Sequence, residues 1–228
     1  MGKNDNGNNG RTELVFVVDR SWSMGGLESD TIGGFNSMLS KQRTIAGECR
    51  VTTLLFDHRI ETLHNHLDIR EVNDLTSRDY WVRGSTALLD AIGLAIDRMI
   101  VTQRHTAAAY RAQHVLFVII TDGYENASRR YSLHQIKQMI TYERERYHWE
   151  FVFLGANIDA EQTAGDFGIS PRCATDFHAD GQGIKASFEA VACAATAVRG
   201  GADLEDLNAP DFLGGVRDDY RSRRRMKR

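Results

Sequence analysis

Continuous apolar runs alternate along the chain with segments in which apolar residues recur every three or four positions. The continuous runs, rich in Val, Ile and Phe, are typical of strands that are buried on both faces. They predict strands over residues 13–19, 50–57, 114–121, 150–155 and 172–177. The periodic segments predict helices over residues 28–46, 86–102, 132–147, 159–167 and 183–199.

Alternation of strands and helices predicts an α/β fold: a doubly wound, mostly parallel central sheet with helices on both faces. Residues 59–67 follow the second strand after a turn too short for a crossover, which predicts one antiparallel edge strand. Residues 68–83 read as irregular, and no clear pattern follows residue 202. The Gly33-Gly34 pair either weakens its helix or allows another element to approach closely.

Carboxylates and hydroxyls are placed where predicted strands end and helices begin. Asp19, Ser21 and Ser23 follow the first strand, Asp122 follows the fourth, and Thr86 opens a helix. In the common doubly wound strand order the first and fourth strands flank the switch point, where ligands bind at the carboxyl edge. The pattern therefore predicts that both acids share one crevice.

Hard oxygen donors without Cys or His suit Mg²⁺ or Mn²⁺ better than zinc. The sequence thus predicts a divalent-metal site.

The motifs resemble the metal-ion-dependent adhesion site (MIDAS) of von Willebrand factor type A domains, in particular the small bacterial members. The resemblance covers roughly residues 12–199 and rests on three segments: Asp19-Arg20-Ser21-Trp22-Ser23, Gly84-Ser85-Thr86 and Thr121-Asp122-Gly123. It implies a Rossmann-like fold in which Asp19, Ser21, Ser23, Thr86 and Asp122 hold the metal. One departure is Trp22, where many relatives carry a small residue.

The resemblance also implies a function without catalysis. The hydroxyls would contact the ion directly, the two Asp directly or through water, and an Asp or Glu of a partner protein would complete the coordination. Trp22, Tyr124 and Asn126 lie nearby and are candidate partner contacts. In relatives the last helix can shift when the ligand binds, which here would involve residues 183–199.

Other residues near the motifs have simpler interpretations. Tyr80 and Trp81 are expected to pack against the protein, and Arg20 and Arg83 are expected to be solvated charges, with contact to an anionic ligand as the alternative.

Two other functions stay open. A metal-dependent phosphatase or hydrolase of the haloacid-dehalogenase type would need a second Asp two residues after the first, where this chain has Ser21. A nucleic-acid-associated protein would act through the basic segment 221–228. Six of its eight residues are Arg or Lys, against 22 basic and 31 acidic residues in the rest of the chain. A solvated, disordered tail is the simpler interpretation of that segment.

The composition is that of an ordinary globular protein. We expect a polar leader over residues 1–11, the A-type domain over 12–199 and an extension over 200–228. Three scattered Cys, no signal-peptide pattern and no membrane-length apolar run lead us to expect free thiols and a cytoplasmic location without membrane contact. His58, His64 and His66 are a weaker metal candidate. Alternate residues share one face of a strand, but an exposed polar edge is the simpler interpretation.

Overall fold

The apolar runs form the centre of a six-stranded sheet in the computed structural model, which describes residues 10–226. Of the expected leader, residues 1–9 lie outside that range, as do tail residues 227 and 228. The strands are β1 (Thr12–Asp19), β2 (Cys49–Phe56), β3 (Ile60–Asp68), β4 (His114–Thr121), β5 (Glu150–Gly155) and β6 (Ala174–Asp176). The helices are α1 (Glu28–Arg43), α2 (Leu88–His105), α3 (Leu133–Tyr147), α4 (Ala160–Asp166), α5 (Gly181–Arg199) and α6 (Gly214–Met226). Three short 3₁₀ turns are η1 (Trp22–Met24), η2 (Ala108–Tyr110) and η3 (Pro171–Cys173).

The strand order is β3-β2-β1-β4-β5-β6, with β3 antiparallel to β2 and every other neighbouring pair parallel. This order confirms the predicted doubly wound sheet with one antiparallel edge. Every residue of β1 is buried, as the uninterrupted apolar run implied. Because β1 and β4 pair directly, their carboxyl ends lie side by side at the switch point.

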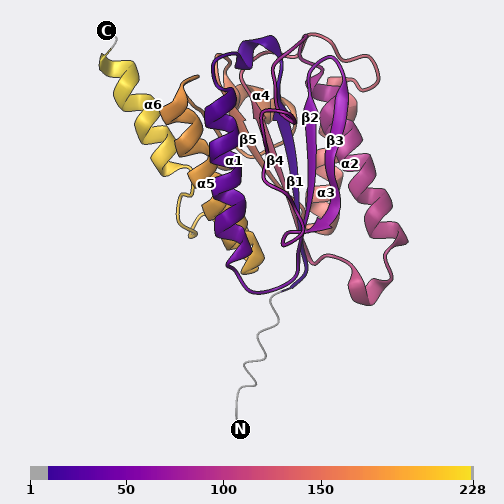
Figure 1. The fold of residues 1–228 in the computed structure, drawn as a ribbon. Coiled ribbons are helices and arrows are strands. Elements are labelled where there is room, and N and C mark those ends of the chain that lie inside the picture. The colour runs from indigo at the N-terminus through magenta and orange to yellow at the C-terminus, as the bar shows by residue number, and fades with distance from the viewer. Residues whose placement is uncertain (1–9, 227–228) are drawn as a thin grey trace.

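Helices cover both faces of the sheet (Figure 1). Helices α1 and α5 pack together on one face, and α2 packs with α3 on the other. Gly34 explains the close approach of α1 to α5, since a Cβ there would lie only 2.3 Å from Phe188 Cδ2. Gly33, one residue earlier, faces open space.

The C-terminal segment differs from the expectation of a patternless, disordered tail, because α6 extends to Met226 and lies against α5 (Figure 1). Few apolar residues fix it, of which Val216 is fully buried. An ion pair between Arg223 and Asp180 also joins this helix to the start of α5. Of its thirteen residues only Val216, Tyr220 and Met226 are large and apolar or aromatic, which is why the sequence did not reveal the helix.

The histidines of the β2–β3 edge do not share a face, contrary to the expectation from alternation. A register shift interrupts the β2–β3 pairing, and His66 adopts a left-handed backbone conformation. His64 is buried against Phe35 of α1 and bonds Thr53, whereas the His66 ring lies 2.8 Å from Glu13 Oε1. The expected exposed edge is therefore wrong for His64. Within residues 10–226 no three His, Cys, Asp or Glu side chains form a metal-holding group.

No helix among residues 10–226 has both the length and the apolar character needed to cross a membrane.

Candidate metal centre

Asp19 ends β1 with a fully buried carboxylate. Its Oδ1 accepts a hydrogen bond from the backbone N–H of Ser21 at 2.7 Å, and its Oδ2 accepts one from the Thr121 hydroxyl at 2.6 Å. Burial raises the pKa of the Asp19 carboxyl above its ordinary value, and these hydrogen bonds partly offset that rise. The side chain is therefore fixed in one orientation by both neighbouring strand ends.

The two serines of the first loop point the same way. The turn η1 brings Ser21 Oγ and Ser23 Oγ to 2.9 Å from each other. The loop is also tied to the Thr86 loop, because Trp22 N–H donates to Gly84 O and Arg83 N–H donates to Arg20 O. Gly84 has a φ of +67°, and a side chain there would meet the His58 ring.

Gly123 shows that all three predicted segments converge. A Cβ placed on Gly123 would lie 3.2 Å from Ser23 Oγ and 3.8 Å from Thr86 Oγ1. The hydroxyls of the first and second loops therefore surround the residue that follows Asp122. A Cβ at position 123 would require the Ser23 hydroxyl to move by a few tenths of an ångström.

Asp122 is the unusual member of the group. Both of its carboxylate oxygens are buried, and neither has a hydrogen-bond partner in the described part of the chain. Burial raises the pKa of this carboxyl to about 6; the nearby Ser23 hydroxyl lowers it in part, and the Asp19 charge raises it further. A buried carboxylate without a partner is costly unless a cation neutralises it. Together with the surrounding hydroxyl oxygens, this donor set fits a hard divalent cation.

The segment after Asp122 supports the Thr86 loop. Helix α2 has Ala87 at its N-cap position and no side-chain cap of its own. Residues beyond Asp122 supply the missing acceptors: Asn126 accepts from Thr86 N–H, Glu125 from Leu89 N–H and Ser128 from Asp90 N–H. The second and third loops are thus held together before any ligand binds.

Arg20 is a correction to the sequence interpretation, because its side chain is fully buried instead of solvated. Its Nε lies 3.1 Å from Asp57 Oδ2, and its guanidinium also pairs with Glu61. Arg83 pairs with the same Asp57, and both guanidiniums lie over the Trp81 ring. These two arginines therefore anchor the loops.

The surface around the centre is open and aromatic. The side chain of Trp22 is 68% exposed and that of Tyr124 is 62% exposed. Beside the Thr86 loop lies an open groove of about 490 Å³. Its lining includes the cations Arg59 and Arg129, the His58 ring and the carboxylate of Asp90. Asn126 also lines this groove, although its amide oxygen is committed to the Thr86 loop.

Sequence reasoning missed two supporting residues. Thr121 orients Asp19, and its only sequence signal is a hydroxyl at the last position of a buried strand. Tyr80 was expected to pack, and it is indeed buried, but its hydroxyl also donates to Asp19 O at 2.6 Å. That contact joins residues 61 positions apart, so no local sequence pattern predicts it.

Comparison with known proteins identifies the fold. No family model matches the sequence, and none of the curated proteins matches it. Among solved structures, proximal thread matrix protein 1 from the mussel byssus, with a zinc-occupied MIDAS motif, is 15% identical with a TM-score of 0.58; the match covers 82% of this chain and 46% of that one. The manganese-loaded TRAP protein of Plasmodium vivax is 17% identical with a TM-score of 0.57, covering 78% and 72% of the two chains.

A von Willebrand factor type A protein from Catenulispora acidiphila is 10% identical with a TM-score of 0.53; the match covers 80% of this chain and 42% of that one. Two of these three solved chains are thus matched over less than half of their length. At such identities the likeness concerns the backbone fold alone. The chain therefore has the fold of a von Willebrand factor type A domain.

Proposed function

We propose that this chain is a non-enzymatic protein-binding module that holds Mg²⁺ or Mn²⁺ at the carboxyl edge of its sheet. Asp19, Ser21, Ser23, Thr86 and Asp122 would hold the ion, and an Asp or Glu of a partner protein would complete its coordination. The observation that carries the proposal is the Asp122 carboxylate, which is buried without a partner beside converging hydroxyls.

The structural neighbours support a divalent metal but differ in its identity, since the mussel protein carries zinc and the Plasmodium protein manganese. For this chain the all-oxygen donor set favours Mg²⁺ or Mn²⁺. Zinc belongs in every titration as the competing outcome.

The surroundings support an acidic protein partner. If both Asp side chains act through water, the three neutral hydroxyls around a divalent ion leave positive charge that attracts a carboxylate. The groove beside Thr86 adds Arg59 and Arg129, which favour a partner segment with further acidic residues. Exposed Trp22 and Tyr124 are of the residue types enriched at binding hot spots.

An enzymatic role lacks the group it would need. A phosphatase of the haloacid-dehalogenase type would use a carboxylic acid two residues after Asp19, where Ser21 stands. Ser21 Oγ instead lies beside Ser23 Oγ. Against nucleic-acid binding through the tail, one of its six basic residues, Arg223, is already paired with Asp180 and Asp219.

The first test is calorimetric titration of metal-stripped protein with Mg²⁺, Mn²⁺ and Zn²⁺, with Asp19→Ala and Asp122→Ala alongside. We expect saturable Mg²⁺ and Mn²⁺ binding that both variants lose. Equal binding by the wild type and both variants would refute the site.

The second test addresses the partner carboxylate. Water-proton relaxation of the Mn²⁺-loaded protein reports the exchangeable water at the open coordination position. Adding acetate, or a peptide containing Glu, should lower the relaxation rate, whereas the matched Gln peptide should not. An equal response to both peptides would argue against a carboxylate ligand.

A further inference from the structure

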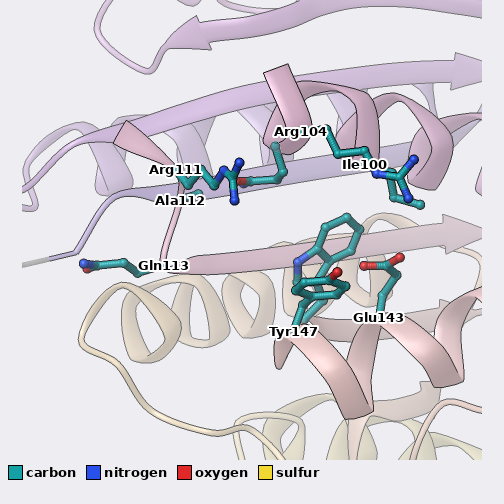
Figure 2. A pocket seen from close by; sticks show the side chains of 9 residues that line it. Ile100, Arg104, Arg111, Ala112, Gln113, Glu143 and Tyr147 are labelled. Atoms are coloured by element: carbon teal, nitrogen blue, oxygen red, sulfur yellow. The ribbon is translucent and has the colours of Figure 1, made fainter. Parts of the chain in front are cut away.

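A second cavity lies at the amino ends of β4 and β5, at the opposite edge of the sheet from the metal centre (Figure 2). It measures about 170 Å³ and is bounded by the last turns of α2 and α3 and by the segments that lead into the two strands. Glu143 and Tyr147 of α3 face Ile100 and Arg104 of α2 across it. Nothing in the metal centre uses these residues.

Glu143 contributes a largely buried carboxylate to this cavity. Its side chain lines the cavity although the residue is only 4% exposed. Within residues 10–226 its carboxylate has neither a hydrogen-bond partner nor an ion pair. Arg104 lies near enough to act on its charge but forms no ion pair with it. Burial raises the pKa of the Glu143 carboxyl, and the Arg104 charge offsets this in part. The carboxylate oxygens open onto the cavity, so a donor carried by a ligand can bond to them in place of water.

The wall of the cavity suits a flat apolar body. The Trp149 indole is 6% exposed and is stacked on Phe117 at a centroid distance of 5.5 Å. Ile100 and Ala112 add aliphatic surface. Ligand pockets typically combine such an apolar lining with a few fixed polar groups. The indole face also favours a cationic group near its ring.

The mouth of the cavity is positive. Arg104 and Arg111 both line it, and both residues are exposed. Arg111 Nε donates to Thr106 O at 3.0 Å, which fixes its guanidinium there. A ligand that carried only a cation would be repelled at this rim, and one that carried only an anion would leave Glu143 without a donor.

Size limits the ligand further. A protein cavity of ~150 Å³ holds one benzene molecule, so a cavity of about 170 Å³ accepts a body of about one ring. We propose that this cavity binds a small zwitterion with a one-ring body. Its protonated nitrogen would meet Glu143, and its anionic group would meet Arg104 and Arg111.

Three probes that share a phenyl ring test the proposal. L-phenylalanine carries both charges, phenethylamine only the ammonium and 3-phenylpropionate only the carboxylate. Each is titrated into ¹⁵N-labelled protein, with the Trp149 indole N–H as reporter. We expect shifts confined to residues 100–113 and 143–149. Phenylalanine should bind at least about tenfold more tightly than the other two, because it satisfies both charged sites.

Two variants assign the contacts. Glu143→Gln keeps the shape of the side chain and should lower the affinity for phenylalanine to that for 3-phenylpropionate. Glu145→Gln, at an exposed position of the same helix, is the matched control and should change nothing. Arg104→Gln should weaken the binding of phenylalanine and 3-phenylpropionate but should not weaken that of phenethylamine, because the variant removes a repelling charge. This provides a second test should Glu143→Gln fold poorly.

The proposal is overturned by the absence of shifts at these residues with all three probes, which would mean that the cavity closes in solution. Equal affinities for the three probes would overturn it too. So would phenylalanine binding that survives both Glu143→Gln and Arg104→Gln.

Discussion

The Thr121 hydroxyl donates a hydrogen bond to Asp19 Oδ2 at 2.6 Å, so that the last residue of β4 orients the last residue of β1. Ser21 N–H occupies the other carboxylate oxygen. The two bonds hold Asp19 in place without a metal. Asp122 has no such partners, and this difference between the two acids leads to separate predictions for each strand end.

Thr121→Val removes the hydroxyl and keeps the shape of the side chain. Asp19 Oδ2 then loses its donor, and the carboxylate is free to turn away from the proposed ion. Outer groups that orient metal ligands are typically worth about 10- to 100-fold in affinity. We therefore expect Mg²⁺ affinity to fall by at least about tenfold in calorimetry. Unchanged affinity would show that Thr121 does not position Asp19 for the metal.

Asp122→Asn should stabilise the metal-free protein and abolish the stabilisation that added metal gives the wild type. In metal-free protein the substitution removes a buried charge that lacks a partner, so the free energy of unfolding should be about 1–3 kcal/mol higher than in the wild type. Added Mg²⁺ or Mn²⁺ should raise the Tm of the wild type and leave that of the variant unchanged. Thermal melts after chelation and after metal addition measure both effects.

Glu189→Gln is the control for that experiment, because Glu189 is exposed on α5. Its melting temperature should follow that of the wild type under both conditions. A metal-free Asp122→Asn protein less stable than the wild type would contradict the interpretation of Asp122 as an unpartnered buried charge.

Gly33 and Gly34 form a matched pair in the middle of α1. Gly33→Ala meets open space and should stabilise the protein by about 0.5–1 kcal/mol through helix propensity. Gly34→Ala would place a methyl group 2.3 Å from Phe188 Cδ2 and should destabilise it by about 1–3 kcal/mol. Denaturant unfolding of the two variants gives both values. Equal stabilisation by both would mean that α1 and α5 are less closely packed than the structure shows.

Glu150 makes stability depend on pH at the amino end of β5. Burial, and then the Asp203 charge, raises the pKa of this carboxyl to about 7. The folded protein thus holds the proton more tightly than the unfolded chain does. The resulting stabilisation is complete below about pH 4.5 and is lost as the pH rises through about 7.

Glu150→Gln should remove that dependence. It should stabilise the protein by about 2 kcal/mol at pH 8 relative to the wild type, and by much less at pH 4.5. Melts across this range measure the difference, with exposed Glu161→Gln as the control. A gain that is the same at every pH would rule out titration of Glu150 as the cause.

The sequence predicted the sheet and the three loops that converge at its carboxyl edge because their signals are local. Val17, Val18 and Asp19 show a buried strand ending in an acid, and Ile120, Thr121 and Asp122 show the same. Pairing of β1 with β4 then follows from the common doubly wound order. A pattern of this kind needs no knowledge of distant contacts.

What the sequence could not show depends on distant contacts. Arg20 looks like a surface charge until Asp57 and Glu61 are placed around it. The bulge that separates His64 from His66 arises from strand register, which alternation alone does not specify. Helix α6 has few apolar residues, and its ion pair from Arg223 to Asp180 at the start of α5 joins residues 43 positions apart.

Strand β4 separates Gln113 at the cavity from Asp122 at the metal centre by its full length of eight residues. At ~3.3 Å per residue this is roughly 26 Å, well beyond the roughly 7–10 Å within which substitutions usually influence one another. Ligand binding in the cavity and metal binding at the other end of β4 should therefore be thermodynamically independent unless the strand itself moves. The changes in the free energy of unfolding caused by Asp122→Asn and Glu143→Gln should add.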